Sequence, residues 1–92
     1  MDFPFKEKRN VMVFTCRCVL DKEADICYVT HDEDDGVWQF LCGQDHVEAD
    51  ARIVSLESIV DMDPSITVLA DMPLGCGAMR EDRSSQWKGF RK

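Results

Sequence analysis

The fold is decided by one apolar stretch, Gly36-Val37-Trp38-Gln39-Phe40-Leu41-Cys42-Gly43. In a β-strand, residues two apart point to the same face of the sheet. Trp38, Phe40 and Cys42 therefore share one strongly apolar face, whereas the opposite face is only partly apolar. The pattern predicts a central strand whose aromatic face carries the core, with Gly36 and Gly43 as structural residues at its two ends.

Two further strand-like runs precede this stretch. Residues 11–20 have an apolar residue at every even position, which predicts a half-buried strand with its even positions inside. Residues 26–31 form a shorter run that is rich in β-forming side chains. Because only short polar links join the three runs, we expect them to pair as an antiparallel meander.

A short helix is predicted after Ser55, which is a favourable N-cap residue. The apolar residues at helical spacing that follow it are Leu56, Ile59 and Val60. Pro64 ends the helix because it has no N–H group to donate. The helix is therefore about two turns long and depends on packing for its stability. Its apolar stripe is expected to cover Trp38 and Phe40.

The C-terminal third of the chain predicts a hairpin. Residues 78–81 and 87–90 are strand-like and flank an obvious turn at 82–85. Residues 66–69 fit either a strand or the continuation of a helix. We therefore predict one α+β domain over residues 1–92, built from a small, mostly antiparallel sheet (a meander plus a C-terminal hairpin) packed by one short helix.

The net charge of −7 is unevenly distributed along the chain. Residues 21–63 hold thirteen acidic residues against only two basic ones. Nucleic acid is a poor partner for such a chain because phosphate binding needs a basic field. The charge would steer a basic protein instead, although it would also serve to keep a small domain soluble. The candidate binding residues are Asp32, Glu33, Asp34, Asp35, Asp45, Glu48 and Asp50.

The sequence predicts a cytoplasmic protein without a membrane partner. No run reaches the roughly 18–20 apolar residues that a membrane-spanning helix needs. The first residues lack the basic-then-apolar layout of a signal peptide. Five cysteines, an odd number, indicate free thiols rather than a disulfide framework.

We expect no metal, no cofactor and no catalysis. Cys16 and Cys18 are one residue apart, whereas zinc sites use pairs such as C-x-x-C with a second pair downstream. Cys76, between two glycines, is the candidate nucleophile, and His31 or His46 is the candidate base. Nothing in the sequence brings either histidine to that thiol.

The order and spacing of several motifs resemble a bacterial domain family of unknown function, number 2185. These motifs are Gly36-x-Trp38-x-Phe40-x-x-Gly43, Asp63-Pro64-x-Ile66 and Leu69-x-Asp71-x-Pro73-x-Gly75 followed by Arg80. The family overlaps immunity proteins of polymorphic toxin systems and has no established catalytic residues. The resemblance implies an α+β domain of the bacterial cytoplasm and favours binding over catalysis.

Two functional hypotheses follow from these observations. The first is a non-catalytic protein-binding module, similar to an immunity protein, whose acidic surface meets a basic protein such as a toxin. The alternative is a small-molecule-binding domain with a pocket near residues 72–77, where Pro and Gly make a turn-rich crossing. The edges of a small sheet also leave a homodimer open.

Overall fold

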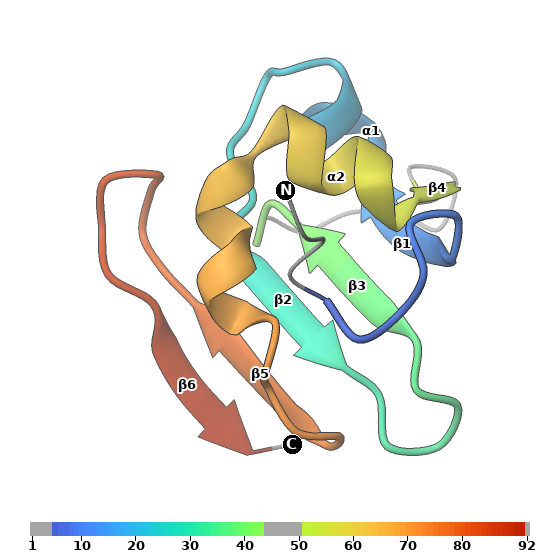
Figure 1. The fold of residues 1–92 in the computed structure, drawn as a ribbon. Helices are drawn as coiled ribbons and strands as arrows, with labels where there is room; N and C mark the ends of the chain where they lie inside the picture. The colour runs from blue at the N-terminus through green and yellow to red at the C-terminus, as the bar shows by residue number, and fades with distance from the viewer. Residues whose placement is uncertain (1–4, 44–50, 92) are drawn as a thin grey trace.

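A computed structural model describes residues 5–43 and 51–91 of the chain. Within them, six strands form one sheet in the order β4-β1-β3-β2-β5-β6 (Figure 1). The strands are β1 (Met12–Cys16), β2 (Tyr28–His31), β3 (Trp38–Leu41), β4 (Ala51–Ser55), β5 (Cys76–Met79) and β6 (Lys88–Arg91). The helices are α1 (Arg17–Leu20), α2 (Leu56–Met62) and the 3-10 helix η2 (Pro64–Leu69). The predicted α+β class is confirmed.

The sheet is mostly antiparallel, as predicted, but its first strand is placed differently from the expected meander. β2 pairs antiparallel with β3, and β5 with β6 forms the C-terminal hairpin. β1 instead lies parallel to β3, with Phe14 opposite Gln39. The reason is that the strand predicted over residues 11–20 stops at Cys16, and α1 turns the chain away before it can form a hairpin with β2.

The buried face of β1 also differs from the prediction. Val13 and Thr15 are buried, whereas the even-numbered Met12 and Phe14 are exposed. Register with β3 sets this choice, because Thr15 lies opposite Phe40. The Thr15 hydroxyl donates a hydrogen bond of 2.7 Å to the Phe40 carbonyl, so its burial leaves no unsatisfied donor.

The core is built on the aromatic face of β3, as predicted. The rings of Trp38 and Phe40 stack with centroids 5.7 Å apart, and both side chains are fully buried. Phe5 packs edge-on against Trp38 at 5.2 Å. Leu56 and Ile59 of α2 belong to the same buried cluster, which confirms that the apolar stripe of the helix covers this face.

Two caps set the boundaries of the helices. The Ser55 hydroxyl accepts a hydrogen bond from the Ser58 N–H, so α2 begins where the sequence predicts. Asp63 follows α2, and its carboxylate accepts from the Ser65 N–H to cap η2. Pro64, an exposed residue, occupies the first turn of η2, and Ile66 from the same helix is fully buried. Residues 66–69 therefore continue the helical layer rather than forming a strand.

Gly36 and Gly43 flank β3 with φ values of +71° and +84°, a backbone region that other residues rarely adopt. Gly43 is exposed and Gly36 only half-buried, so both act through backbone conformation and not through core packing.

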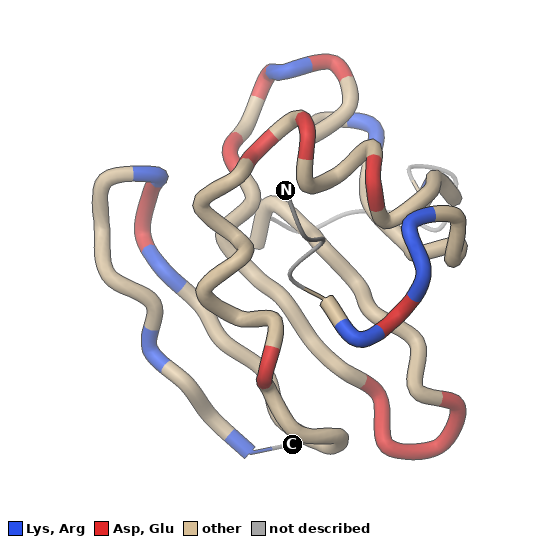
Figure 2. The backbone as a smooth tube through the Cα atoms, viewed as in Figure 1, with Lys and Arg blue, Asp and Glu red and all other residues tan. Residues whose placement is uncertain are grey.

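Charged residues gather in different parts of the molecule. Figure 2 shows basic residues along the C-terminal hairpin and a run of acidic residues at the turn between β2 and β3. Further acidic residues lie on α2 and on the connection from α1 to β2. The predicted acidic surface is therefore divided between separate segments.

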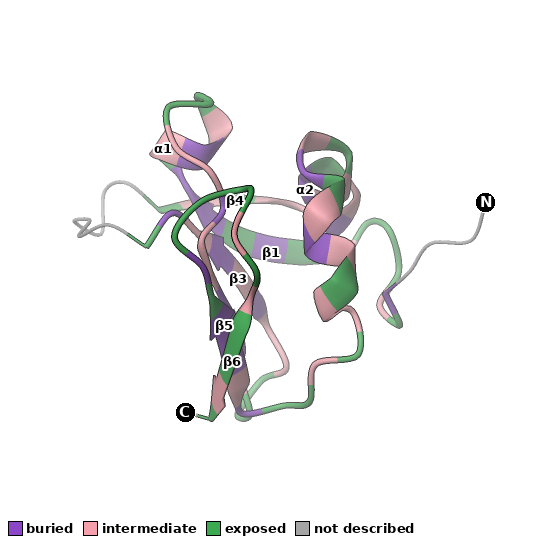
Figure 3. Ribbon diagram, turned by 90° about the vertical axis from the view of Figure 1, so that its left-hand side faces the viewer, coloured by how far each residue is buried: buried purple, intermediate pink, exposed green. Residues whose placement is uncertain are grey.

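The sheet is covered unequally on its two sides. In Figure 3, which views the molecule from the β6 side, α2 lies on one side of the sheet and the short α1 lies at its upper end on the other. We call the side of the sheet away from α2 the open face. No helix in the described ranges has the length and hydropathy to cross a membrane.

Candidate functional site

The turn between β2 and β3, residues 32–35, is held in shape by its own hydrogen bonds. The Gly36 N–H donates to the Asp32 carbonyl at 2.9 Å, which closes the turn. The Asp32 carboxylate accepts from the Asp34 N–H, and the Asp35 carboxylate accepts from the Val37 N–H. These side-chain bonds to the backbone fix the turn locally. We call residues 32–35 the acidic turn.

The acidic turn carries negative charge that no described basic residue neutralises. Glu33, Asp34 and Asp35 are exposed, and none of the ion pairs within residues 5–43 and 51–91 uses them. Acidic residues that do pair with an arginine are Asp21, Asp25, Glu57 and Asp63. Three other predicted binding residues, Asp45, Glu48 and Asp50, lie outside the described residues.

The acidic turn lies beside residues 72–77, the turn-rich connection that leads from η2 into β5 and that we call the crossing. A Cβ atom added to Gly75 would come within 3.1 Å of Glu33 Oε2, and one added to Gly36 would contact Leu74. The Gly75 N–H also donates to the His31 carbonyl at the end of β2. The side chain of Leu74 is 52% exposed, so an apolar group accompanies the carboxylates at this end of the sheet.

The crossing also borders an open hollow of about 610 Å³. It lies between η2 and the C-terminal hairpin, and its wall is mainly apolar. The residues that line it are Val68, Leu69, Asp71, Met72, Pro73, Cys76, Gly77, Ala78, Trp87, Gly89, Phe90 and Arg91. The hollow includes residues 72, 73, 76 and 77, so a concavity does lie where the sequence places the alternative binding site.

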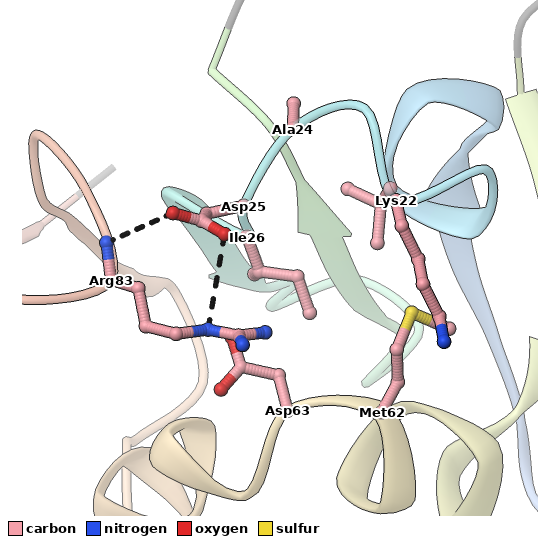
Figure 4. Close-up of a pocket in the computed structure, with 8 residues that line it drawn as sticks. Lys22, Ala24, Asp25, Ile26, Met62, Asp63 and Arg83 are labelled. Carbon is pink, nitrogen blue, oxygen red and sulfur yellow. Dashed lines mark hydrogen bonds and ion pairs between the residues drawn. The ribbon is translucent and has the colours of Figure 1, made fainter.

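A second hollow, of about 210 Å³, lies between α1, the following loop and the end of α2 (Figure 4). Arg83 reaches into it between two carboxylates. Its Nε atom is 3.8 Å from Asp25 Oδ1, and its Nη2 atom is 3.4 Å from Asp63 Oδ2. The charges that face this hollow are therefore largely satisfied by one another.

Arg80 is buried and pairs with Asp63, one of the residues that line this hollow. Its Nη2 atom is 2.9 Å from Asp63 Oδ2, its Nε donates to the Ile26 carbonyl, and its Nη1 donates to the Ser65 hydroxyl. The guanidinium group also lies 4.2 Å from the centroid of the Trp87 ring. With its donors used in this way, Arg80 has a structural role. Sequence reasoning placed Asp63 and Arg80 in one motif pattern but did not predict that they pair.

The candidate nucleophile and one candidate base are neighbours across β2 and β5. Cys76 lies opposite His31 in the strand register. However, His31 Nδ1 is 2.9 Å from the Met72 carbonyl, and Nε2 faces a Glu7 carboxylate oxygen at 3.7 Å. Since a carbonyl only accepts, Nδ1 carries the proton, and neither ring nitrogen bonds to the thiol. The geometry therefore does not activate Cys76, and His46 lies outside the described residues.

None of the five cysteines forms a disulfide bond, and Cys16 and Cys42 are buried. Burial raises the pKa of Cys27 above its ordinary value, a shift that the nearby Arg80 opposes. A raised pKa makes the thiol a weaker nucleophile at neutral pH. In the ranges that the structure describes, no group of three or more His, Cys, Asp or Glu side chains is placed to hold a metal ion.

Comparisons with known proteins give no family. A scan against protein-family models, a search of curated proteins and a search of solved structures each returned no match. The resemblance to family 2185 therefore stays a prediction, and the function must be argued from the geometry.

Proposed function

We propose that this chain is a non-catalytic protein-binding domain whose acidic turn contacts a basic surface on another protein. One observation carries the proposal. Glu33, Asp34 and Asp35 are exposed and form no ion pair with the residues that the structure describes, on a turn that its own hydrogen bonds hold in shape. Fixed charges of one sign accelerate encounter with an oppositely charged partner and select against like-charged ones.

The surroundings of the acidic turn support a protein partner. The side chain of Leu74 is exposed next to Gly36 at the end of this turn and offers the apolar contact that the centre of an interface needs. A basic toxin, as the family resemblance implies, is a partner of this kind. We place the interaction in the bacterial cytoplasm on the same resemblance.

The test is affinity capture from the bacterium that encodes the chain, followed by calorimetric titration with the captured protein. The variant E33Q/D34N/D35N removes three charges from the acidic turn. E23Q/D61N/E81Q removes the same charge from exposed residues elsewhere and is the matched control. We expect at least about tenfold weaker binding for the first variant only, and wild-type binding that weakens steeply with salt.

Two results would contradict the proposal. One is equal affinity of the two triple variants for the captured protein. The other is a dissociation constant that does not change between low and high salt.

The hollow at the crossing supports a second candidate function, the binding of a small apolar molecule. Its volume of about 610 Å³ lies within the range of ligand pockets, roughly 300–1,000 Å³, and its wall is mainly apolar. Trp87 and Met72 on the wall are spectroscopic reporters. A small-molecule ligand should change the Trp87 fluorescence and the Met72 methyl resonance together. A ligand that binds without moving either signal occupies another site.

A further inference from the structure

All six described strands contribute residues to the open face of the sheet, and α1 lies at its upper end (Figure 3). The register aligns one row of residues on it, Phe90, Gly77, Thr30, Gln39, Phe14 and Ile53. The Phe90 ring lies over Gly77 and packs against Tyr28 at a centroid distance of 5.6 Å. None of the six residues in this row carries a charge.

Large apolar side chains are concentrated on this face. Six are exposed in the described chain, and four of the six are here: Met12, Phe14, Ile53 and Met79. Their exposed fractions are 56%, 37%, 57% and 49%. Clustered apolar side chains in water mark an interaction surface more often than single ones do.

The open face is also almost without charge. Among the described strand residues, Lys88 is the one charged side chain on it, opposite Met79 in the register. The helix α2, which carries Glu57 and Asp61, lies on the other side of the sheet (Figure 3). The described strand residues therefore offer a basic protein no complementary charge on the open face.

We propose that a second copy of this chain covers the open face, with the two sheets packed face to face in a symmetric dimer. An apolar, nearly uncharged face is complementary to itself, which a twofold interface requires. In this arrangement the two copies of α2 lie on the outer sides, so their acidic residues are far apart. This dimer does not depend on the proposed function.

The size of the face is sufficient. The molecule measures 29 × 28 × 26 Å and exposes 5928 Å². One side of such a body is about a sixth of the surface, on the order of 1,000 Å², and a standard interface buries about 800 Å² per partner.

Methionine-methyl NMR tests the dimer without any substitution. Met12 and Met79 lie on the open face, and Met62 and Met72 lie on the helix layer and at the hollow. Spectra of methyl-labelled protein are recorded from about 1 µM to about 1 mM, a range that covers weak to moderate association. We expect the first pair of resonances to shift with concentration and the second pair to stay. Shifts of Met62 and Met72 alone, or no shifts, overturn the proposal.

Sedimentation of two charge variants gives the second test. I53E/M79E places carboxylates on the open face, and V68E/L74E places them on exposed apolar residues elsewhere. The mass measured by sedimentation for wild type and for V68E/L74E should reach twice the 10.5 kDa chain mass, which is the mass of a dimer. I53E/M79E should raise the dimer dissociation constant by at least about tenfold, because the carboxylate introduced at position 53, opposite Phe14 in the register, would be buried without a cation. A urea midpoint checks that each variant is folded. A monomeric wild type, or equal effects of both variants, refutes the dimer.

Discussion

Arg80 and Asp63 form a buried ion pair, with Nη2 2.9 Å from Oδ2 and each side chain 2% exposed. Asp63 stands between α2 and η2, and Arg80 follows β5 directly. The same guanidinium donates to the Ile26 carbonyl ahead of β2. One side chain therefore ties the helical layer and the C-terminal hairpin to the centre of the sheet.

Removing either partner of this pair should destabilise the fold strongly. Arg80→Met leaves the Asp63 carboxylate buried with its hydrogen bonds from Ser65 and a longer contact to the Arg83 cation, at 3.4 Å. Asp63→Asn leaves a buried guanidinium without its counter-charge. We expect a loss of about 3–5 kcal/mol in the free energy of unfolding for each variant, because an uncompensated charge stays in the interior. Urea denaturation followed by Trp fluorescence measures the loss.

Arg83 provides the control for this prediction, since its side chain is 54% exposed. Arg83→Met should lower the free energy of unfolding by less than about 1 kcal/mol, because exposed ion pairs contribute little to stability. The double variant of Asp63 and Arg80 should cost less than the sum of the single variants. Additive losses would show that the two side chains do not stabilise the fold as a pair.

Gly77 should be intolerant of any side chain, whereas Gly89 on the neighbouring strand should accept one. A Cβ atom at Gly77 would lie 2.5 Å from Phe90 Cζ and 2.9 Å from the Val29 carbonyl oxygen. At Gly89 the nearest atom would be 3.8 Å away, which is an ordinary contact. We expect Gly77→Ala to cost about 1–3 kcal/mol and Gly89→Ala to be near neutral. Equal urea midpoints for the two variants would contradict the placement of the Phe90 ring.

The sequence predicted those parts of the fold that depend on local signals. The i, i+2 spacing of Trp38 and Phe40 identified the core face. Ser55 and Pro64 bounded the short helix, because an N-cap and a missing N–H act within one turn of the chain. The acidic turn and the hairpin turn at residues 82–85 could likewise be predicted from residues adjacent in the sequence.

The failures arose where distant residues decide the structure. Within residues 11–20, apolar residues occur at odd as well as even positions, so the periodicity alone does not determine which face of the strand is buried. The choice is made by Thr15, whose hydroxyl partner is the Phe40 carbonyl, 25 positions away. Asp63 and Arg80, which form an ion pair, are 17 positions apart in the sequence, and no local sequence pattern predicts that they pair. The apolar character of the open face was missed in part because Met12 and Phe14 were expected on the buried side of β1.

The Ser55 cap should contribute measurably to stability. Its hydroxyl accepts from the Ser58 N–H at 3.2 Å and satisfies one donor in the first turn of α2. Ser55→Ala should therefore cost about 1 kcal/mol in urea denaturation. Ser55→Asp retains an acceptor and is the matched control, with stability close to that of wild type. A loss as large in Ser55→Asp as in Ser55→Ala would show that the hydroxyl does not act as a cap.

Acidification should loosen the turn between β5 and β6 at Asp82. The Ser84 N–H donates to the Asp82 carboxylate at 2.8 Å and the Ser85 hydroxyl at 3.1 Å, and these bonds lower the pKa of Asp82 below its ordinary 3.8. Because the pKa is lower in the folded chain, the stabilisation is present above pH 3.8 and is lost as the pH falls through the folded-state value. Carbon-detected NMR should show the Asp82 carboxyl titrating below 3.8, together with the Ser84 amide. In Asp82→Asn the Ser84 amide should no longer follow this titration. A midpoint at or above 3.8 would mean that the two serines do not hold the ionised carboxylate.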